Sequence, residues 1–205
     1  MTARAFVLLG AVLASCGAPP AKPLRAPVSD FQPLEPGLEW TYDLDGRPQV
    51  RSVTGAESIG RFECQVMETR TGDIVERAWM RWDQDWLKVY RVSSGRKAVT
   101  FEDPIQLVSR RAAPGWTWKF TEQHGPMSME VQGQYEGDEE ILVLDRLRPC
   151  ARIRLVKRAA GRVVIDQTCW YVRKLGLVRM TVVAAGEDGE VRSTLILRSC
   201  NFTVD

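Results

Sequence analysis

The chain has 205 residues, of which 44% are hydrophobic and 26% are charged, which is enough for one domain, or two small ones, with a hydrophobic core. Its 16 glycines and 11 prolines are close to average usage, so collagen-like and low-complexity classes are excluded. The net charge of +2 argues against a nucleic-acid binder, and the single histidine, His124, argues against histidine-based metal sites and Ser–His or Cys–His catalysis.

Residues 1–15 have the pattern of a signal peptide, with one cation followed by a short apolar run. The run is far shorter than the roughly 20 residues that span a bilayer. The sequence Leu13-Ala14-Ser15-Cys16 resembles the bacterial lipobox. That resemblance implies cleavage before Cys16, a thioether-linked diacylglycerol on its sulfur and usually an N-acyl chain. Two or more acyl chains give stable membrane anchoring. The alternative is a plain secretory signal with an incidental cysteine.

Residues 16–30 are predicted to form a lipidated tether. Gly17, in place of the aspartate that retains lipoproteins at the inner membrane of enterobacteria, implies an outer-membrane lipoprotein facing the periplasm. The following segment contains Pro19, Pro20, Pro23 and Pro27, which favour an extended polyproline II conformation. We therefore expect a single folded domain over residues 31–205.

The folded part is predicted to be all-β. Helical periodicity is nearly absent, whereas short runs rich in Val, Ile, Thr, Trp and Tyr alternate with turn signals such as Asp45-Gly46 and Ala160-Gly161. Turns spaced about 8–15 residues apart favour an antiparallel meander over alternating strands and helices. We expect about twelve strands that form a curved sheet or half-barrel.

An internal repeat is visible in three sequence matches that occur in the same order. Residues 37–42 (GLEWTY) match residues 115–120 (GWTWKF), and Arg61–Cys64 matches Leu147–Cys150. The hairpin 76–92 then matches 166–183 with one inserted residue. The order favours two repeats, over about 31–101 and about 102–200. The alternative is that aromatic-rich strands look alike by composition.

Two of these motifs resemble a loose group of duplicated all-β envelope lipoproteins. The first motif is Pro-Leu-x-x-Gly-x-x-Trp-x-Tyr, present here as residues 33–42. The second is a Trp-Tyr-x-x-x-x-Gly-Leu-Val hairpin, present as residues 170–178. The resemblance covers most of the mature chain and implies a fold and an envelope location rather than an activity.

The aromatic residues of the repeated motif alternate with polar residues, so each set is expected on one face of its strand. One set is Trp40 and Tyr42, and the other is Trp116, Trp118 and Phe120. Such rings bury about 150–250 Å² each, and we interpret them as core. The alternative is a shelf on which a hydrophobic ligand stacks.

Four further cysteines follow Cys16: Cys64, Cys150, Cys169 and Cys200. An exported chain meets an oxidising compartment. Cys150 and Cys169 lie nearly symmetrically about the Ala160-Gly161 turn, which favours a disulfide between them. No cysteine pair has zinc-ligand spacing, and no base is placed to activate a thiol. We therefore expect no catalytic residue, no metal site and no cofactor.

Basic residues gather in the last third of the chain. They form either a solvated surface or a face for an anionic partner such as a lipid headgroup. The residues are Arg152, Arg154, Lys157, Arg158, Arg162, Arg173, Lys174 and Arg179.

These patterns predict a membrane-anchored envelope lipoprotein that is not an enzyme. Its expected partners are the membrane, through the lipid anchor, and a hydrophobic ligand held by a binding or interaction module; no nucleic-acid partner is expected. The alternatives are an assembly lipoprotein that docks to another envelope protein and, less favoured, a hydrolase of envelope polymers. Fold alone does not decide among them.

Overall fold

The computed structural model describes residues 31–124, 127–186 and 189–203, in which every regular element is a β-strand. The predicted signal peptide, the Cys16 lipidation site and the tether over residues 16–30 lie outside the described residues. The twelve strands are β1 (Glu39–Leu44), β2 (Arg47–Ile59), β3 (Phe62–Thr71), β4 (Ile74–Asp83), β5 (Trp86–Ser94), β6 (Lys97–Ser109), β7 (Thr117–His124), β8 (Met127–Val143), β9 (Arg146–Ala159), β10 (Arg162–Val172), β11 (Gly176–Gly186) and β12 (Gly189–Cys200).

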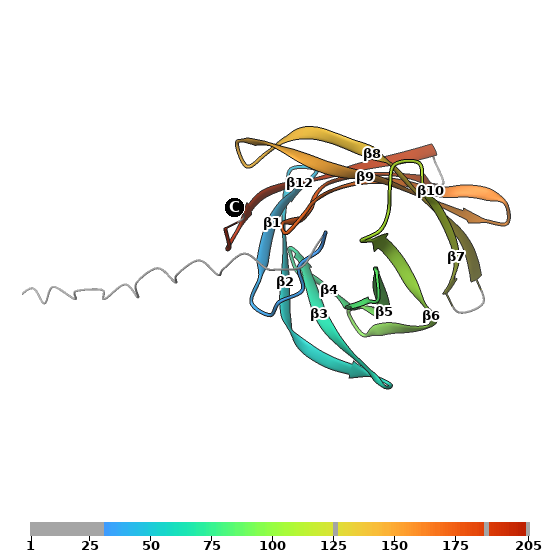
Figure 1. Ribbon diagram of the computed structural model, residues 1–205. Helices are drawn as coiled ribbons and strands as arrows, with labels where there is room; N and C mark the ends of the chain where they lie inside the picture. The colour runs from blue at the N-terminus through green and yellow to red at the C-terminus, as the bar shows by residue number, and fades with distance from the viewer. Residues whose placement is uncertain (1–30, 125–126, 187–188, 204–205) are drawn as a thin grey trace, which may run out of the picture.

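All twelve strands belong to one antiparallel sheet. Its order is β6-β5-β4-β3-β2-β1-β12-β11-β10-β9-β8-β7, so each half is a meander and β1 pairs with β12 where the halves meet. The sheet curls round until its edge strands, β6 and β7, reach the same side of the molecule (Figure 1). The predicted all-β fold is confirmed. The described residues include no helix long and apolar enough to cross a membrane.

Tight turns set the strand register. Asp45 and Gly46 both have positive φ, at 50° and 83°, and Ala160 and Gly161 repeat this with 48° and 77°. Two central residues with positive φ define the type I′ turn, whose twist matches that of antiparallel strands. The turn dipeptides in the sequence therefore mark true hairpins.

The two halves of the sheet repeat the same backbone detail. The N–H of Gly37 donates to the Val53 carbonyl at 2.8 Å, and the N–H of Gly115 donates to the Tyr135 carbonyl at 2.7 Å. Each acceptor is followed by a β-bulge at a glycine. The strands β1–β6 therefore correspond to β7–β12, and the junction falls within residues 110–116, later than the boundary expected near residue 102.

A side-chain unit on the outer face is also repeated. In the first half, the Arg91 guanidinium lies 4.8 Å from the Trp79 ring centroid, and the Trp79 indole N–H donates to Glu57 at 2.8 Å. The corresponding residues of the second half are Arg179, Trp170 and Glu139. Each tryptophan is followed by a bulge on the partner strand. The two hairpins therefore match at their tryptophans, and the extra residues lie at the tip of the first hairpin, not in the second as the sequence match predicted.

The main core fills the inside of the curled sheet, and the start of the domain closes one end of it. Phe31, Gln32 and Leu34 are buried. The Gln32 carbonyl accepts a hydrogen bond from the Trp82 indole at 2.9 Å, and its side-chain oxygen accepts one from the Leu177 N–H at 3.3 Å. Residues 31–34 thus connect the β4–β5 and β10–β11 hairpins.

Candidate functional site

Trp40 and Tyr42 lie on β1, the strand that pairs with β12 where the two halves of the sheet meet; we call this junction the closed seam. The Trp40 indole N–H donates to the Leu175 carbonyl at 2.6 Å, and the Tyr42 hydroxyl donates to the Leu177 carbonyl at 2.8 Å. Both rings are fully enclosed in the core, and burial raises the pKa of the Tyr42 hydroxyl. These two aromatic residues are core residues, and their hydrogen bonds join the motif of residues 33–42 to the hairpin of residues 170–178.

Trp118 corresponds to Trp40 but makes no such bond. Its side chain is buried, and its indole N–H has no hydrogen-bond acceptor in the described part of the chain. A Cβ on Gly133 of β8 would lie only 2.1 Å from the indole ring. The indole therefore lies flat on Gly133, over the neighbouring strand. Phe120, which corresponds to Tyr42, is half-buried and has no hydroxyl to donate.

Trp116 departs from the expected buried stripe. It is 38% exposed and precedes β7, whereas its counterpart Leu38 is buried. The Trp116 ring lies 5.5 Å from Trp86 of β5 and 6.2 Å from Trp118, and Trp86 lies 5.4 Å from Trp118, centroid to centroid. These three residues, which we call the tryptophan cluster, join β5 to the start of β7. The tryptophan cluster takes the position that the hydrogen bonds of Trp40 and Tyr42 occupy in the other half.

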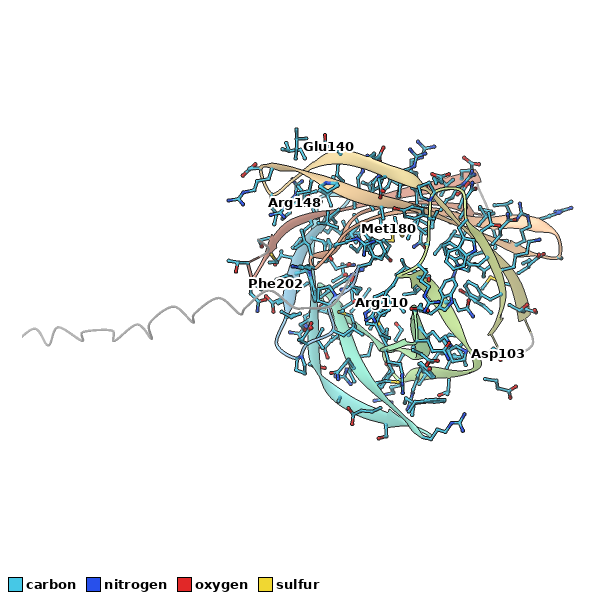
Figure 2. The ribbon with its side chains drawn as sticks, viewed as in Figure 1. Asp103, Arg110, Glu140, Arg148, Met180 and Phe202 are labelled. Carbon is cyan, nitrogen blue, oxygen red and sulfur yellow. The ribbon has the colours of Figure 1, made fainter. Side chains whose placement is uncertain are left out.

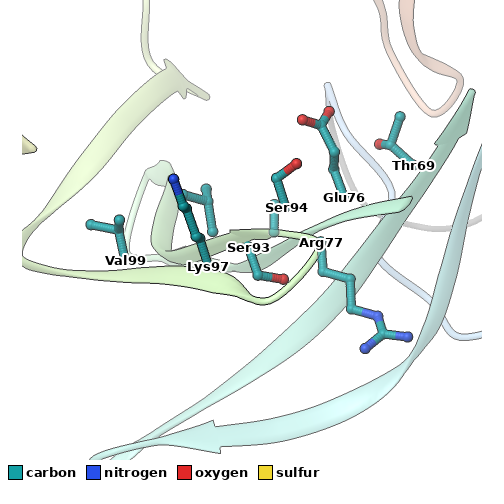
Figure 3. Close-up of a pocket in the computed structure, with 9 residues that line it drawn as sticks. Thr69, Glu76, Arg77, Ser93, Ser94, Lys97 and Val99 are labelled. Atoms are coloured by element: carbon teal, nitrogen blue, oxygen red, sulfur yellow. The ribbon is translucent and has the colours of Figure 1, made fainter. Parts of the chain in front are cut away.

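None of the five predicted aromatic residues lines a described hollow of the surface. The one in Figure 3 has a volume of about 330 Å³ and is formed by residues of β3 to β6. Glu76, Ser94 and Lys97 line it together with Val99. Three further hollows, of about 270–480 Å³, are likewise lined by other residues. These cavities give no support to a ligand shelf built on the aromatic stripes.

The expected Cys150–Cys169 disulfide is not formed. All four described cysteines are free thiols. Cys169 is paired with Ile153, three residues from Cys150, and an odd offset places the two cysteines on opposite faces of the sheet. Burial raises the pKa of each of these two thiols to about 11. Thiols that stay protonated at neutral pH are poor nucleophiles.

Much of the basic cluster is paired within the molecule. Arg152 contacts Glu136 at 2.6 Å, and Arg154 contacts Asp166 at 2.5 Å, which holds the pKa of the Asp166 carboxyl below its usual value. Arg173 and Arg179 lie over the rings of Phe31 and Trp170. This arrangement favours the interpretation as a partly neutralised surface over that of an anion-binding face.

A buried ion pair between β7 and β9 was not predicted from the sequence. The Lys157 ammonium lies 2.8 Å from both carboxylate oxygens of Glu122, whose side chain is 1% exposed. The two residues lie on β7 and β9; Lys157 pairs with Val131 of β8, which in turn pairs with Phe120, two residues before Glu122. Alternation along β7 places Glu122 on the inner face with Trp118. Only the pairing of three strands brings these charges together. No cluster of metal-ligating side chains was found among the described residues.

No hydrogen-bonded ladder joins β6 to β7, although the two strands lie close together, and we call this break in the sheet the open seam. The β6 strand pairs with β5 and the β7 strand pairs with β8, and these strands end the sheet. At the corresponding position in the other half, Trp40–Leu44 pairs with β12. Edge strands present unpaired N–H and C=O groups to their surroundings. The open seam is the clearest asymmetry between the two halves.

The β6 edge carries features that oppose strand pairing. Its register on β5 jumps between Thr100 and Ile105. The intervening residues include exposed Glu102 and Asp103 and also Pro104. Asp103 projects away from the sheet (Figure 2). Charges, prolines and bulges are the means by which proteins protect edges from pairing. This explains physically why β6 leaves β7 unpaired.

No family model matches the chain, and no curated protein matches it. Two solved structures are similar to it. One is a "putative lipoprotein" from Parabacteroides distasonis, with 12% identity, coverage of 84% of this chain and 98% of that chain, and a TM-score of 0.47. The other is a "putative exported protein with YmcC-like fold" from Bacteroides fragilis, with 13% identity, coverage of 84% and 99%, and a TM-score of 0.47.

Proposed function

We propose that the chain is a lipid-anchored protein of the bacterial envelope, attached through Cys16 to the outer membrane on its periplasmic side. In this proposal it is a non-enzymatic module that docks to another envelope protein. The Leu13-Ala14-Ser15-Cys16 sequence supports the anchor. Two or more acyl chains suffice for stable anchoring.

The observation that supports docking over ligand carriage is the burial and bonding of Trp40 and Tyr42. Both polar atoms are satisfied by backbone carbonyls inside the core, so these rings are structural. Ligand sites are commonly concave and apolar with volumes of about 300–1,000 Å³. The hollow of Figure 3 reaches that volume, but exposed Glu76 and Lys97 stand in it, which is unfavourable for an acyl chain.

The absence of an enzymatic role is part of the proposal. Burial raises the pKa of the Cys150 and Cys169 thiols, and the buried Glu122 carboxylate is neutralised by Lys157. Groups held in this way are unsuited to nucleophilic attack or proton transfer.

Two measurements test the proposal. First, Cys16→Ser should abolish labelling by a fatty-acid probe and leave the precursor uncut; normal labelling of the variant would contradict the anchor. Second, the purified mature domain should give a native mass without a bound molecule. A stoichiometric acyl mass would instead support a lipid carrier and contradict a purely docking role.

A further inference from the structure

We propose that the open edge of β7 binds an extended segment of a partner polypeptide as an added antiparallel strand. The inference rests on the proposed docking function and assigns its surface. Strand addition of this kind takes its affinity from main-chain hydrogen bonds and its specificity from alternate side chains. The pairing of β12 with β1 shows how a strand can be added at the corresponding edge of the sheet.

The backbone groups of β7 that face the open seam follow from the hydrogen bonds of its neighbours. The Tyr135 N–H donates to the Trp116 carbonyl at 2.9 Å. Since such positions alternate along an antiparallel pair, Trp118 and Phe120 bond to β8. The groups of Lys119 and Thr121 therefore point into the seam.

The β1 strand confirms this direction. Odd-numbered residues of its edge bond to the β12 side: the Asp45 N–H donates to Thr194 at 3.1 Å, and the Glu39 carbonyl accepts from Asn201 at 3.2 Å. With Trp40 matched to Trp118, Glu39 corresponds to Thr117. The backbone edge that bonds to β12 in β1 is therefore the edge that has no hydrogen-bonded strand beside it in β7.

The β7 edge carries charged Lys119 and inward Glu122 but lacks the proline and the register shift found on β6. It contains no proline, and its inward charge, Glu122, is neutralised by Lys157. Trp116, which is 38% exposed, directly precedes the strand. Large aromatic residues of this kind anchor many protein interfaces. A regular edge without proline or bulge, beside a partly exposed tryptophan, is the arrangement that we expect of a docking strand.

The side chains of β7 define the chemistry of the occupant. Trp118 and Phe120 face inward, so the added strand should present apolar side chains on that face. Lys119 faces outward, is 65% exposed and lies 3.8 Å from Glu130. Opposite charges across neighbouring strands are favourable, so an acidic residue is expected opposite Lys119. The occupant is therefore an extended peptide that is apolar on one face and carries one acidic residue, opposite Lys119, on the other.

The probe for this proposal is a synthetic peptide with the sequence of residues 190–199, the strand that closes the other seam. By the β1–β12 register, Ser199 lies opposite Thr41, the counterpart of Lys119. A second peptide carries Glu in place of Ser199, and a scrambled peptide is the control. We expect saturable binding of the first peptide, severalfold tighter and salt-sensitive binding of the second, and none of the scrambled one.

Thr121→Pro removes an N–H that points into the seam, and Thr121→Val keeps it as the matched control. Thr121→Pro should weaken peptide binding by about tenfold or more, whereas Thr121→Val should bind like the wild type. Should the proline variant fail to fold, Trp116→Ala provides the second test, with the same expected weakening. Equal binding by all the folded variants would overturn the proposal.

Amide hydrogen exchange provides an independent readout. In the free protein, the amides of Lys119 and Thr121 should exchange faster than those of Thr41 and Asp43, their counterparts in the closed seam. The peptide should slow them. Equal protection before peptide is added would mean that the seam is already closed, and would refute the proposal. That outcome leaves Cys16 labelling and the native mass unchanged, so it is separable from a failure of the proposed function.

Discussion

The indole N–H of Trp40 donates a 2.6 Å hydrogen bond to the carbonyl of Leu175, a residue 135 positions later in the chain. This bond and that of Tyr42 to Leu177 connect the first strand of one half to the β10–β11 hairpin of the other. In the second half, Trp118 has no acceptor in the described chain and the tryptophan cluster replaces these hydrogen bonds. One seam of a nearly two-fold sheet is therefore closed and the other is open.

Tyr42→Phe should destabilise the domain by about 1–2 kcal/mol, because it leaves the buried Leu177 carbonyl without its donor. Urea unfolding followed by tryptophan fluorescence measures the difference. Tyr90→Phe is the matched control, since the Tyr90 hydroxyl lies at a longer 3.4 Å from Asp83, and it should cost less. An equal loss in the two variants would show that the Tyr42 hydrogen bond carries no special share of the stability.

Trp40→Ala should cost about 3–5 kcal/mol, a large part of a typical domain's stability. Trp118→Ala removes an equally large ring but no hydrogen bond, so it should cost less. Denaturant melts beside a fluorescent fatty-acid titration separate the core interpretation from a ligand shelf. Unchanged midpoints together with lost probe binding would reverse the assignment of these rings to the core.

Gly133→Ala should destabilise the protein, because the new methyl group would overlap the Trp118 indole at 2.1–2.6 Å. Forcing an aromatic ring out of such a position costs about 1–3 kcal/mol. The same substitution made in a Trp118→Ala background should cost much less. If both backgrounds lose the same amount, the contact between the indole and β8 is not the cause.

Alkaline pH should weaken the fold. Burial raises the pKa of the Cys169 thiol from 9.0 to about 11, so the folded state holds this proton more tightly than the unfolded state does. Its contribution is fully present below pH 9 and declines as the pH rises toward 11, by about 2–3 kcal/mol in total. Urea midpoints measured across this range should fall more steeply for the wild type than for Cys169→Ala. Parallel slopes would exclude this thiol as a source.

The local pattern of the sequence determined the strands, the turns and the repeat. Asp45-Gly46 and the glycine of Ala160-Gly161 indicate hairpins because glycine and aspartate tolerate the positive φ that a type I′ turn requires. Alternation of apolar residues predicted burial of Trp40, Tyr42 and Trp118. The strands, the turns and the burial of these three rings are encoded within a few neighbouring positions and were correctly predicted, whereas Trp116 is exposed and the junction of the two halves lies later than expected.

The contacts between residues far apart in the sequence depended on the pairing register of the strands. The Cys150–Cys169 bridge looked favourable from symmetry about a turn, but pairing of Cys169 with Ile153 placed the thiols on opposite faces. Glu122 and Lys157 met only because three strands align. Likewise, the tryptophan motif occurs in both halves, yet only one seam closes. Side-chain periodicity fixes the face of a strand, whereas its partners depend on how the whole sheet curls.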